Sequence, residues 1–175
     1  MVNEEEKRLV NHIDTFLRSE RNTALFLMGW AVVVLVLTAW CWLHIADWLV
    51  QGLAFPMMVF AALHLATGFM QWMQWRQRRR NLVKGDEPPE YSALMEELLR
   101  LEIQMPRLQF FRKTSLGIFL FGFAMMLVGM FAGWGEYVVG TGIGLTVQSA
   151  VTLAVDLFKS MRTGLFHHEL KRYMS

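Results

Sequence analysis

The sequence contains a single cysteine, Cys41, among its 175 residues. A lone thiol cannot form an internal disulfide, a thiolate metal cluster or the dithiol pair that disulfide-exchange enzymes use. The sequence also lacks a Walker phosphate-binding loop, a nucleophile elbow and a zinc-protease helix motif. We therefore predict no catalytic site, no cofactor and no bound metal ion.

Charge is also scarce, because only 18% of the residues are charged while 54% are hydrophobic. That balance is too apolar for an ordinary water-soluble domain. The charged residues crowd into three segments and leave four long stretches almost free of charge, at residues 24–45, 49–75, 116–133 and 137–158. At 1.5 Å per helical residue, stretches of this length suit a hydrocarbon core of about 30 Å. The sequence predicts an all-α, polytopic membrane protein with four transmembrane helices.

The basic residues define an orientation for these predicted spans. None of the 17 lysines and arginines falls in the short turns near Asp47 and Glu136, and all lie in the two terminal segments or in the long connection between spans two and three. By the positive-inside rule, the N- and C-termini and the long connection are predicted to be cytoplasmic.

Amphipathic segments precede spans one and three. Apolar residues recur at helical spacing in residues 4–20 and again in residues 90–104, with charged residues between them. The chain is thus predicted to be two transmembrane hairpins, each led by a cytoplasmic amphipathic helix. The predicted boundaries are residues 1–80 for the first unit, 81–89 for a linker, and 90–175 for the second unit with its C-terminal tail.

The two units also match in sequence. Five residues of the first lead segment recur 91 positions later, namely Glu5, Glu6, Leu17, Arg21 and Thr23 as Glu96, Glu97, Leu108, Arg112 and Thr114. We interpret the match as a parallel internal repeat about an axis along the membrane normal. The alternative is that two membrane hairpins share such residues because lipid imposes the same placement on both.

Few polar side chains lie inside the predicted spans, and each is a candidate for function because polar groups are costly in hydrocarbon. They form one stripe on span two and another on span four: His64, Thr67 and Gln71, and Gln148, Ser149, Thr152 and Asp156. Two interpretations remain open. The stripes line a hydrophilic path or proton relay, or they join helices by hydrogen bonds. For Asp156, an ion pair with Lys159 or Arg162 is a third interpretation.

Glycines on span four indicate close helix packing. Gly140 and Gly144 have the Gly-x-x-x-Gly spacing that lets two backbones approach, and the partner is predicted to be a neighbouring span or a second copy of the chain. A haem between His44 and His64 is disfavoured, since His44 lies near the outer boundary whereas His64 lies ~24 Å along its helix from Trp48.

Residues 140–170 resemble the last helix and tail of a family of uncharacterised small bacterial four-span integral membrane proteins with no assigned activity. The resemblance lies in a glycine pair with a leucine, a glutamine, an inner aspartate and a basic tail, here Gly142, Gly144, Leu145, Gln148, Asp156 and Arg162. It implies the four-span architecture and a location in a bacterial inner (plasma) membrane.

Together these features favour a non-catalytic integral membrane subunit or scaffold. We expect it to lie in the lipid bilayer, to self-associate, and to dock a cytoplasmic or membrane protein through its cytoplasmic helices. The alternative is a small channel or transporter that conducts ions or protons along the polar stripes of spans two and four. Nucleic acid is not an expected partner, because the arginine run at residues 76–80 abuts an apolar span.

Overall fold

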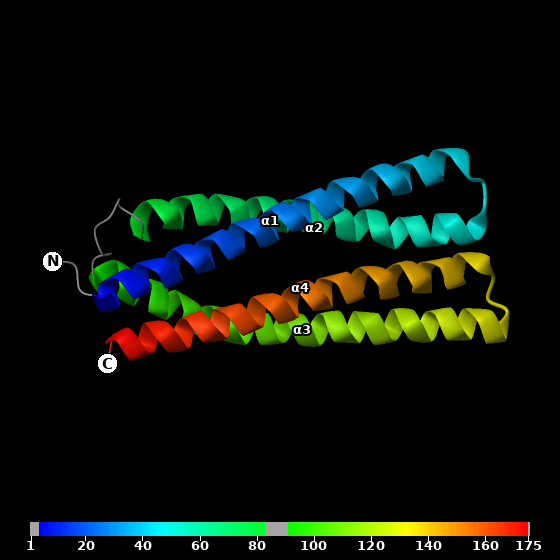
Figure 1. The fold of residues 1–175 in the computed structure, drawn as a ribbon. Helices are drawn as coiled ribbons and strands as arrows, with labels where there is room; N and C mark the ends of the chain where they lie inside the picture. The colour runs from blue at the N-terminus through cyan, green and yellow to red at the C-terminus, as the bar shows by residue number, and fades with distance from the viewer. Residues whose placement is uncertain (1–3, 83–90, 175) are drawn as a thin grey trace.

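The computed structural model describes residues 4–82 and 91–174, which form four long α-helices and no strand. The helices are α1 (Glu4–His44), α2 (Trp48–Leu82), α3 (Tyr91–Ala132) and α4 (Glu136–Met174) (Figure 1). All four are long and apolar enough to cross a membrane. The all-α prediction is confirmed, and four helices of this length and composition are compatible with the predicted four spans. Most of the predicted linker, residues 83–89, lies outside the described residues.

The amphipathic lead segments are not separate helices. Each continues without a break into the predicted span that follows, so that α1 is 41 residues long and α3 is 42. No glycine or proline interrupts α1 before Gly29, and helical hydrogen bonding is therefore free to continue. At 1.5 Å per residue, α1 and α3 each extend over about 60 Å, roughly twice the thickness of a hydrocarbon core.

Short turns join the helices in pairs. Residues 45–47 connect α1 to α2, where Asp47 Oδ1 caps the new helix by accepting hydrogen bonds from the amides of Leu49 at 2.8 Å and Val50 at 3.3 Å. Residues 133–135 connect α3 to α4 through Gly133 and Gly135, whose φ values of 66° and 92° favour glycine. Both turns lie at one end of the molecule and both chain termini at the other (Figure 1). We call the end with the termini the charged end.

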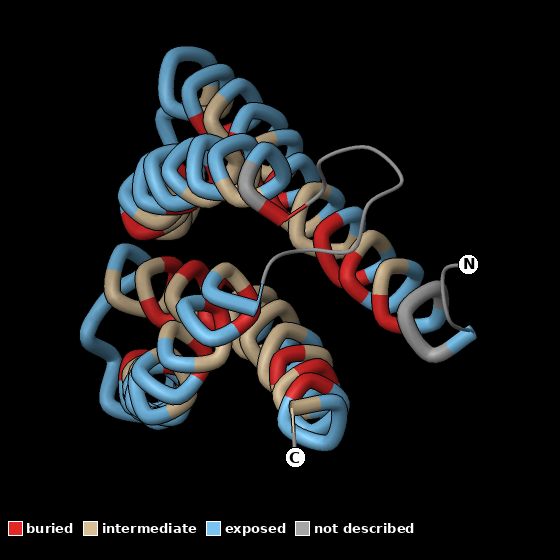
Figure 2. Tube along the Cα trace, turned by 90° about the vertical axis from the view of Figure 1, so that its left-hand side faces the viewer, coloured by how far each residue is buried: buried red, intermediate tan, exposed pale blue. Residues whose placement is uncertain are grey.

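Helices α2 and α4 form the central contact of the fold, with α1 packed on α2 and α3 packed on α4. Viewed along the helices, the buried residues lie on surfaces between helices, both within each pair and between the two pairs (Figure 2). At the charged end α1 also reaches α4, where the rings of Phe16 and Phe166 stack with centroids 4.1 Å apart. All four helices therefore meet at that end.

The largest cluster of buried apolar side chains lies at the charged end, outside the predicted spans. It contains residues of all four helices: Leu9, Ile13, Phe16, Leu17, Leu82, Leu94, Leu101, Phe166 and Leu170. Within the predicted spans, by contrast, many large apolar side chains are exposed, among them Phe26, Val36, Phe69, Leu120 and Phe131. An exposed apolar surface of this kind is suited to contact with lipid. The charged end thus has a core of the kind found in soluble helical bundles.

Candidate functional site

The polar stripes of α2 and α4 meet at His64, which is 7% exposed. Its Nδ1 lies 3.1 Å from Nε2 of Gln148, and its Nε2 lies 3.0 Å from Oγ1 of Thr152. The amide nitrogen of glutamine can only donate, so Nδ1 accepts and the proton of the neutral ring sits on Nε2. Nε2–H then donates to Thr152, whose hydroxyl donates to the carbonyl of Gln148 at 2.9 Å. Both ring nitrogens of His64 are satisfied in the neutral form.

The other stripe residues do not join this network. Thr67 is exposed, and its hydroxyl donates only to backbone carbonyls of its own helix, to Leu63 at 2.9 Å and to His64 at 3.2 Å, so it does not reach the side chains of the network. Ser149 is fully buried and donates to the carbonyl of Leu145 at 2.5 Å. Gln71 lies nearer the charged end, beside a hollow of about 10 Å³ that Lys159 and Arg162 also line. Three of the seven predicted residues, His64, Gln148 and Thr152, are therefore brought together.

Asp156 contacts α3. The hydroxyl of Ser115 donates to Asp156 Oδ2 at 3.5 Å. Arg162 points instead toward α1, where its guanidinium donates to the carbonyl of Ser19 at 3.4 Å and to the hydroxyl of Thr23 at 3.1 Å. The carboxylate and the arginine thus tie α4 to two different helices.

Glycines allow the central helices to come close enough for these hydrogen bonds. A methyl group at Gly144 would lie 2.6 Å from the carbonyl oxygen of Leu53 on α2, and one at Gly140 would overlap the carbonyl oxygen of Leu49. Gly142, on another face of α4, lies against Gly122 and Met126 of α3 in the same way. The partner of the Gly140 and Gly144 pair is therefore α2 of the same chain.

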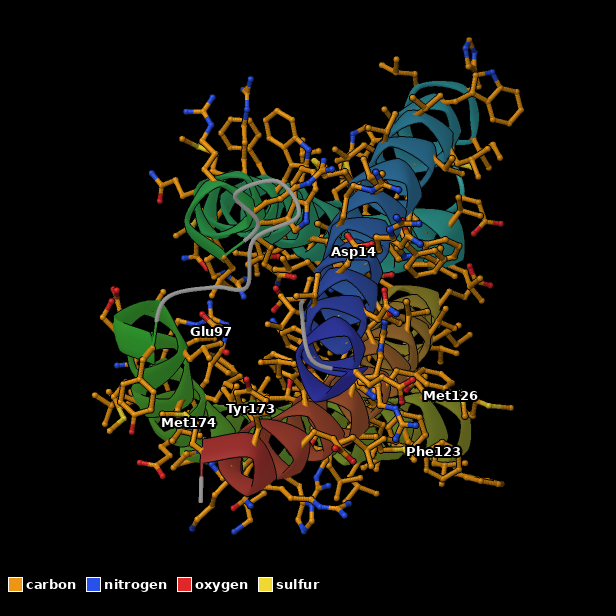
Figure 3. All side chains as sticks on the ribbon, turned by 60° about the vertical axis from the view of Figure 1, so that its left-hand side comes forward. Asp14, Glu97, Phe123, Met126, Tyr173 and Met174 are labelled. Atoms are coloured by element: carbon orange, nitrogen blue, oxygen red, sulfur yellow. The ribbon has the colours of Figure 1, made fainter. Side chains whose placement is uncertain are left out.

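A cluster of charged side chains at the charged end was not predicted. Arg78 of α2 contacts Glu20 of α1 at 2.6 Å and Glu97 of α3 at 3.5 Å, while Arg100 of α3 contacts Glu97 at 3.0 Å and Glu20 at 3.9 Å. We call these four residues the ion-pair cluster, and Figure 3 labels Glu97 within it. Burial raises the pKa of the Glu97 carboxyl, and the nearby Arg100 and Arg78 offset part of that rise.

One signal in the sequence could have revealed the cluster. Glu97 stands between Leu94 and Leu101 at spacings of three and four residues, and both leucines are buried. An acid at that position of a helix shares the apolar face, where it needs a charged partner. One partner, Arg100, stands three residues along the same helix and was within reach of the sequence. The other, Arg78, lies on α2, whose rotation about its own axis is set by packing.

Among the described residues, no three His, Cys, Asp or Glu side chains come together as metal ligands. The polar groups assembled here join helices, His64 of α2 to Gln148 and Thr152 of α4, and Ser115 of α3 to Asp156 of α4. No family model, curated protein or solved structure matches the chain.

Proposed function

We propose that this chain is a non-catalytic integral membrane subunit or scaffold that holds a partner protein against its charged end. Its location in a bacterial inner membrane, with both termini cytoplasmic, is part of the proposal. The docking of a partner protein is supported by one observation, an apolar stripe on the face of α3 that points away from the helix bundle.

The stripe consists of large apolar side chains four residues apart, at Tyr91, Met95, Leu99 and Ile103. Their exposed fractions are 64%, 41%, 54% and 60%. Residues four apart lie on one face of a helix, so these side chains form a continuous strip. The opposite face of the same segment already packs into the core through Leu94 and Leu101.

Lipid is poorly placed to cover this stripe. Leu99 precedes Ala132, the outer end of α3, by 33 residues, or ~50 Å of helix, and Tyr91 precedes it by 41 residues, or ~62 Å. A whole bilayer, headgroups included, is about 40–45 Å thick. Much of the stripe therefore faces water unless a protein covers it, and an exposed apolar strip rimmed by charge is typical of a docking surface.

The charged end is also built to hold its shape. The ion-pair cluster joins α1, α2 and α3, and the apolar cluster joins all four helices. A rigid surface loses little conformational entropy when a partner binds. This is the property that a scaffold requires.

The alternative, a small channel or transporter, is supported by one atom of the polar network. Gln148 Oε1 is buried without a hydrogen-bond partner in the described part of the chain, and an unsatisfied buried acceptor is a place where a passing proton donor or water could bind. Against it, the remaining polar atoms of His64, Gln148 and Thr152 bond to one another. A liposome flux assay on the purified protein tests this alternative directly, because proton or ion flux above that of empty liposomes would favour it.

Photo-cross-linking in intact cells tests the scaffold proposal. A photoreactive amino acid at Leu99 should give a discrete adduct, while the same amino acid at the exposed Gln109 on α3 should give none. The substitution Ile103→Asp, one turn along the stripe, should abolish the Leu99 adduct because a carboxylate in an apolar interface is costly to desolvate.

The mass of the adduct identifies the kind of partner. An adduct at twice the mass of the chain would assign the stripe to self-association, and a different mass would assign it to another protein. Equal labelling from Leu99 and Gln109, or no adduct at Leu99, would contradict the proposal. Unchanged yield of the Ile103→Asp protein in the membrane is the control for folding.

A further inference from the structure

A hollow of about 200 Å³ opens between α1 and α2 at the charged end. Its lining contains three arginines, one acid and one tryptophan, and consists of Asp14, Leu17, Arg18, Arg21, Trp75 and Arg79. We call it the Trp75 hollow. Asp14, labelled in Figure 3, marks its α1 side.

The Trp75 hollow carries an excess of positive charge. Asp14 and Arg18 form an ion pair at 2.7 Å and neutralise each other. Arg21 and Arg79 stand over the ring of Trp75, with their guanidinium carbons 5.8 Å and 5.7 Å from its centroid. Neither forms an ion pair with another residue that the structure describes. Two guanidinium groups are thus held beside one ring without a carboxylate between them, an arrangement that an anion would stabilise.

Hydrogen-bond donors are also in surplus at this place. The indole Nε1–H of Trp75 and the Nε–H of Arg21 are buried and find no acceptor among the described residues. A buried donor without an acceptor is uncommon and calls for an explanation. The guanidinium groups of Arg21 and Arg79 line the hollow, where the oxygens of an anion can accept hydrogen bonds from their terminal N–H groups.

The position of the hollow along the helices selects the kind of anion. Trp75 is the last residue of the second predicted span, and Arg21 lies three residues before the first predicted span begins at residue 24. Both side chains therefore lie near the level of lipid headgroups, where tryptophan rings also tend to gather. We infer that the Trp75 hollow is a binding site for a phosphate group, held by Arg21 and Arg79, whose source is the headgroup of an anionic lipid or free phosphate.

Guanidinium chemistry fits this assignment. Arginine binds phosphate oxygens through two parallel N–H groups, and basic pockets between helices at the inner membrane face are suited to anionic headgroups. A second basic hollow, between α2 and α3, is lined by Arg78, Arg100 and Arg107. There Arg78 and Arg100 are already paired with Glu20 and Glu97. The unneutralised pair over Trp75 is the better anion site.

Native mass spectrometry of the whole chain in a neutral detergent tests the inference. The protein is titrated with phosphatidylglycerol, with zwitterionic phosphatidylcholine, and with inorganic phosphate. We expect one tightly retained phosphatidylglycerol per chain and no comparable retention of phosphatidylcholine. The double variant Arg21→Gln, Arg79→Gln should bind phosphatidylglycerol about 30-fold more weakly, since each arginine near a charged headgroup contributes about a factor of five.

The matched control is Arg112→Gln, Lys113→Gln. It removes two positive charges from exposed residues of α3 just before the third predicted span and leaves the hollow intact. Equal loss of affinity in both double variants would overturn the inference, because general attraction to the protein's surface charge would then explain binding. If the first double variant does not fold, the single change at the exposed Arg79 serves in its place.

The phosphate titration separates the two sources. Competition by millimolar inorganic phosphate against phosphatidylglycerol in the wild type, absent in the double variant, supports a phosphate-binding hollow that the lipid fills. Phosphate binding without lipid binding would assign the site to free phosphate and overturn the lipid source. Absence of both would overturn the site. None of these outcomes depends on the α3 stripe, so the proposed scaffold function stands or fails separately.

Discussion

His64 on α2 and Gln148 on α4, which are 84 residues apart in the chain, share a hydrogen bond of 3.1 Å between Nδ1 and Nε2. The bond joins the two helices that form the centre of the fold. Because both side chains are buried in the predicted spans, each would otherwise leave polar atoms without partners in an apolar setting. The contact explains why two strongly polar residues are tolerated at this depth.

A double-mutant cycle should measure this contact as a modest packing interaction. We expect His64→Leu and Gln148→Leu each to lower the free energy of unfolding by about 1 kcal/mol, with a coupling between them of roughly 0.6 to 1.7 kcal/mol. Reversible unfolding in mixed micelles provides the measurement. Additive effects would show that the two side chains do not interact. Loss of proton flux in His64→Leu without loss of stability would instead support the channel alternative.

The stability of the charged end should depend on pH through Glu97. Its carboxyl has a pKa raised above the ordinary 4.5, chiefly by burial. At a pH well below 4.5 the group is protonated in the folded and unfolded states alike. As the pH rises, the unfolded chain loses this proton first, so the folded state loses stability until the pH has passed the folded pKa.

Glu97→Gln removes this titration and keeps the shape of the side chain. The thermal midpoint of the wild type, measured relative to that of Glu97→Gln, should therefore fall as the pH is raised from about 4.5. Glu96→Gln, at the neighbouring exposed position, is the matched control and should follow the wild type. A difference between wild type and Glu97→Gln that is constant with pH, or that rises, would contradict the raised pKa.

Sequence reasoning predicted what hydrophobicity alone determines. Runs of apolar residues determine where a helix can cross a bilayer, so the four helices and their short turns follow from composition. The sequence placed His64 on one polar stripe and Gln148 on the other, and left open whether the stripes join helices or line a path. Their exact pairing depends on the rotation of α2 against α4, which Gly140 and Gly144 set by contact with Leu49 and Leu53.

The charged end was harder to predict. An amphipathic lead segment can form a separate helix or continue into the span that follows with the same sequence pattern, and α1 runs unbroken through residues 20–24. Likewise, the apolar side chains in the segment 91–103 divide into a buried face and an exposed face. Local periodicity does not separate those faces, because each repeats at helical spacing.

Labelling of introduced cysteines can test the predicted orientation of the chain in the membrane. Starting from a Cys41→Ala background, cysteines at the exposed Ala46 and Trp134 in the turns should react with an impermeant thiol reagent added to intact cells. A cysteine at the exposed His168 near the C-terminus should react only after the membrane is opened. The physical reason is the absence of lysine and arginine from both turns. If the cysteine at residue 168 were labelled in intact cells, the predicted orientation would be wrong.

Gly140→Ala should destabilise the contact between α2 and α4. The added methyl group would overlap the carbonyl oxygen of Leu49, which belongs to helix backbone and cannot move aside as a flexible side chain could. Separation of the helices would relieve the overlap at a cost of about 1–3 kcal/mol. Because His64 and Gln148 span the same interface, the separation should also weaken their hydrogen bond, and the coupling energy between them should fall in the Gly140→Ala background.

Gly164→Ala is the matched control on the same helix. A methyl group there meets no atom within 4 Å, so the change adds helix propensity without a collision. Relative to glycine, alanine favours a helix by up to about 1 kcal/mol. The two substitutions are chemically identical and should shift the unfolding midpoint in opposite directions. Stabilisation by both would mean that α2 does not approach Gly140, and it would leave this glycine pair available for contact with a second copy of the chain.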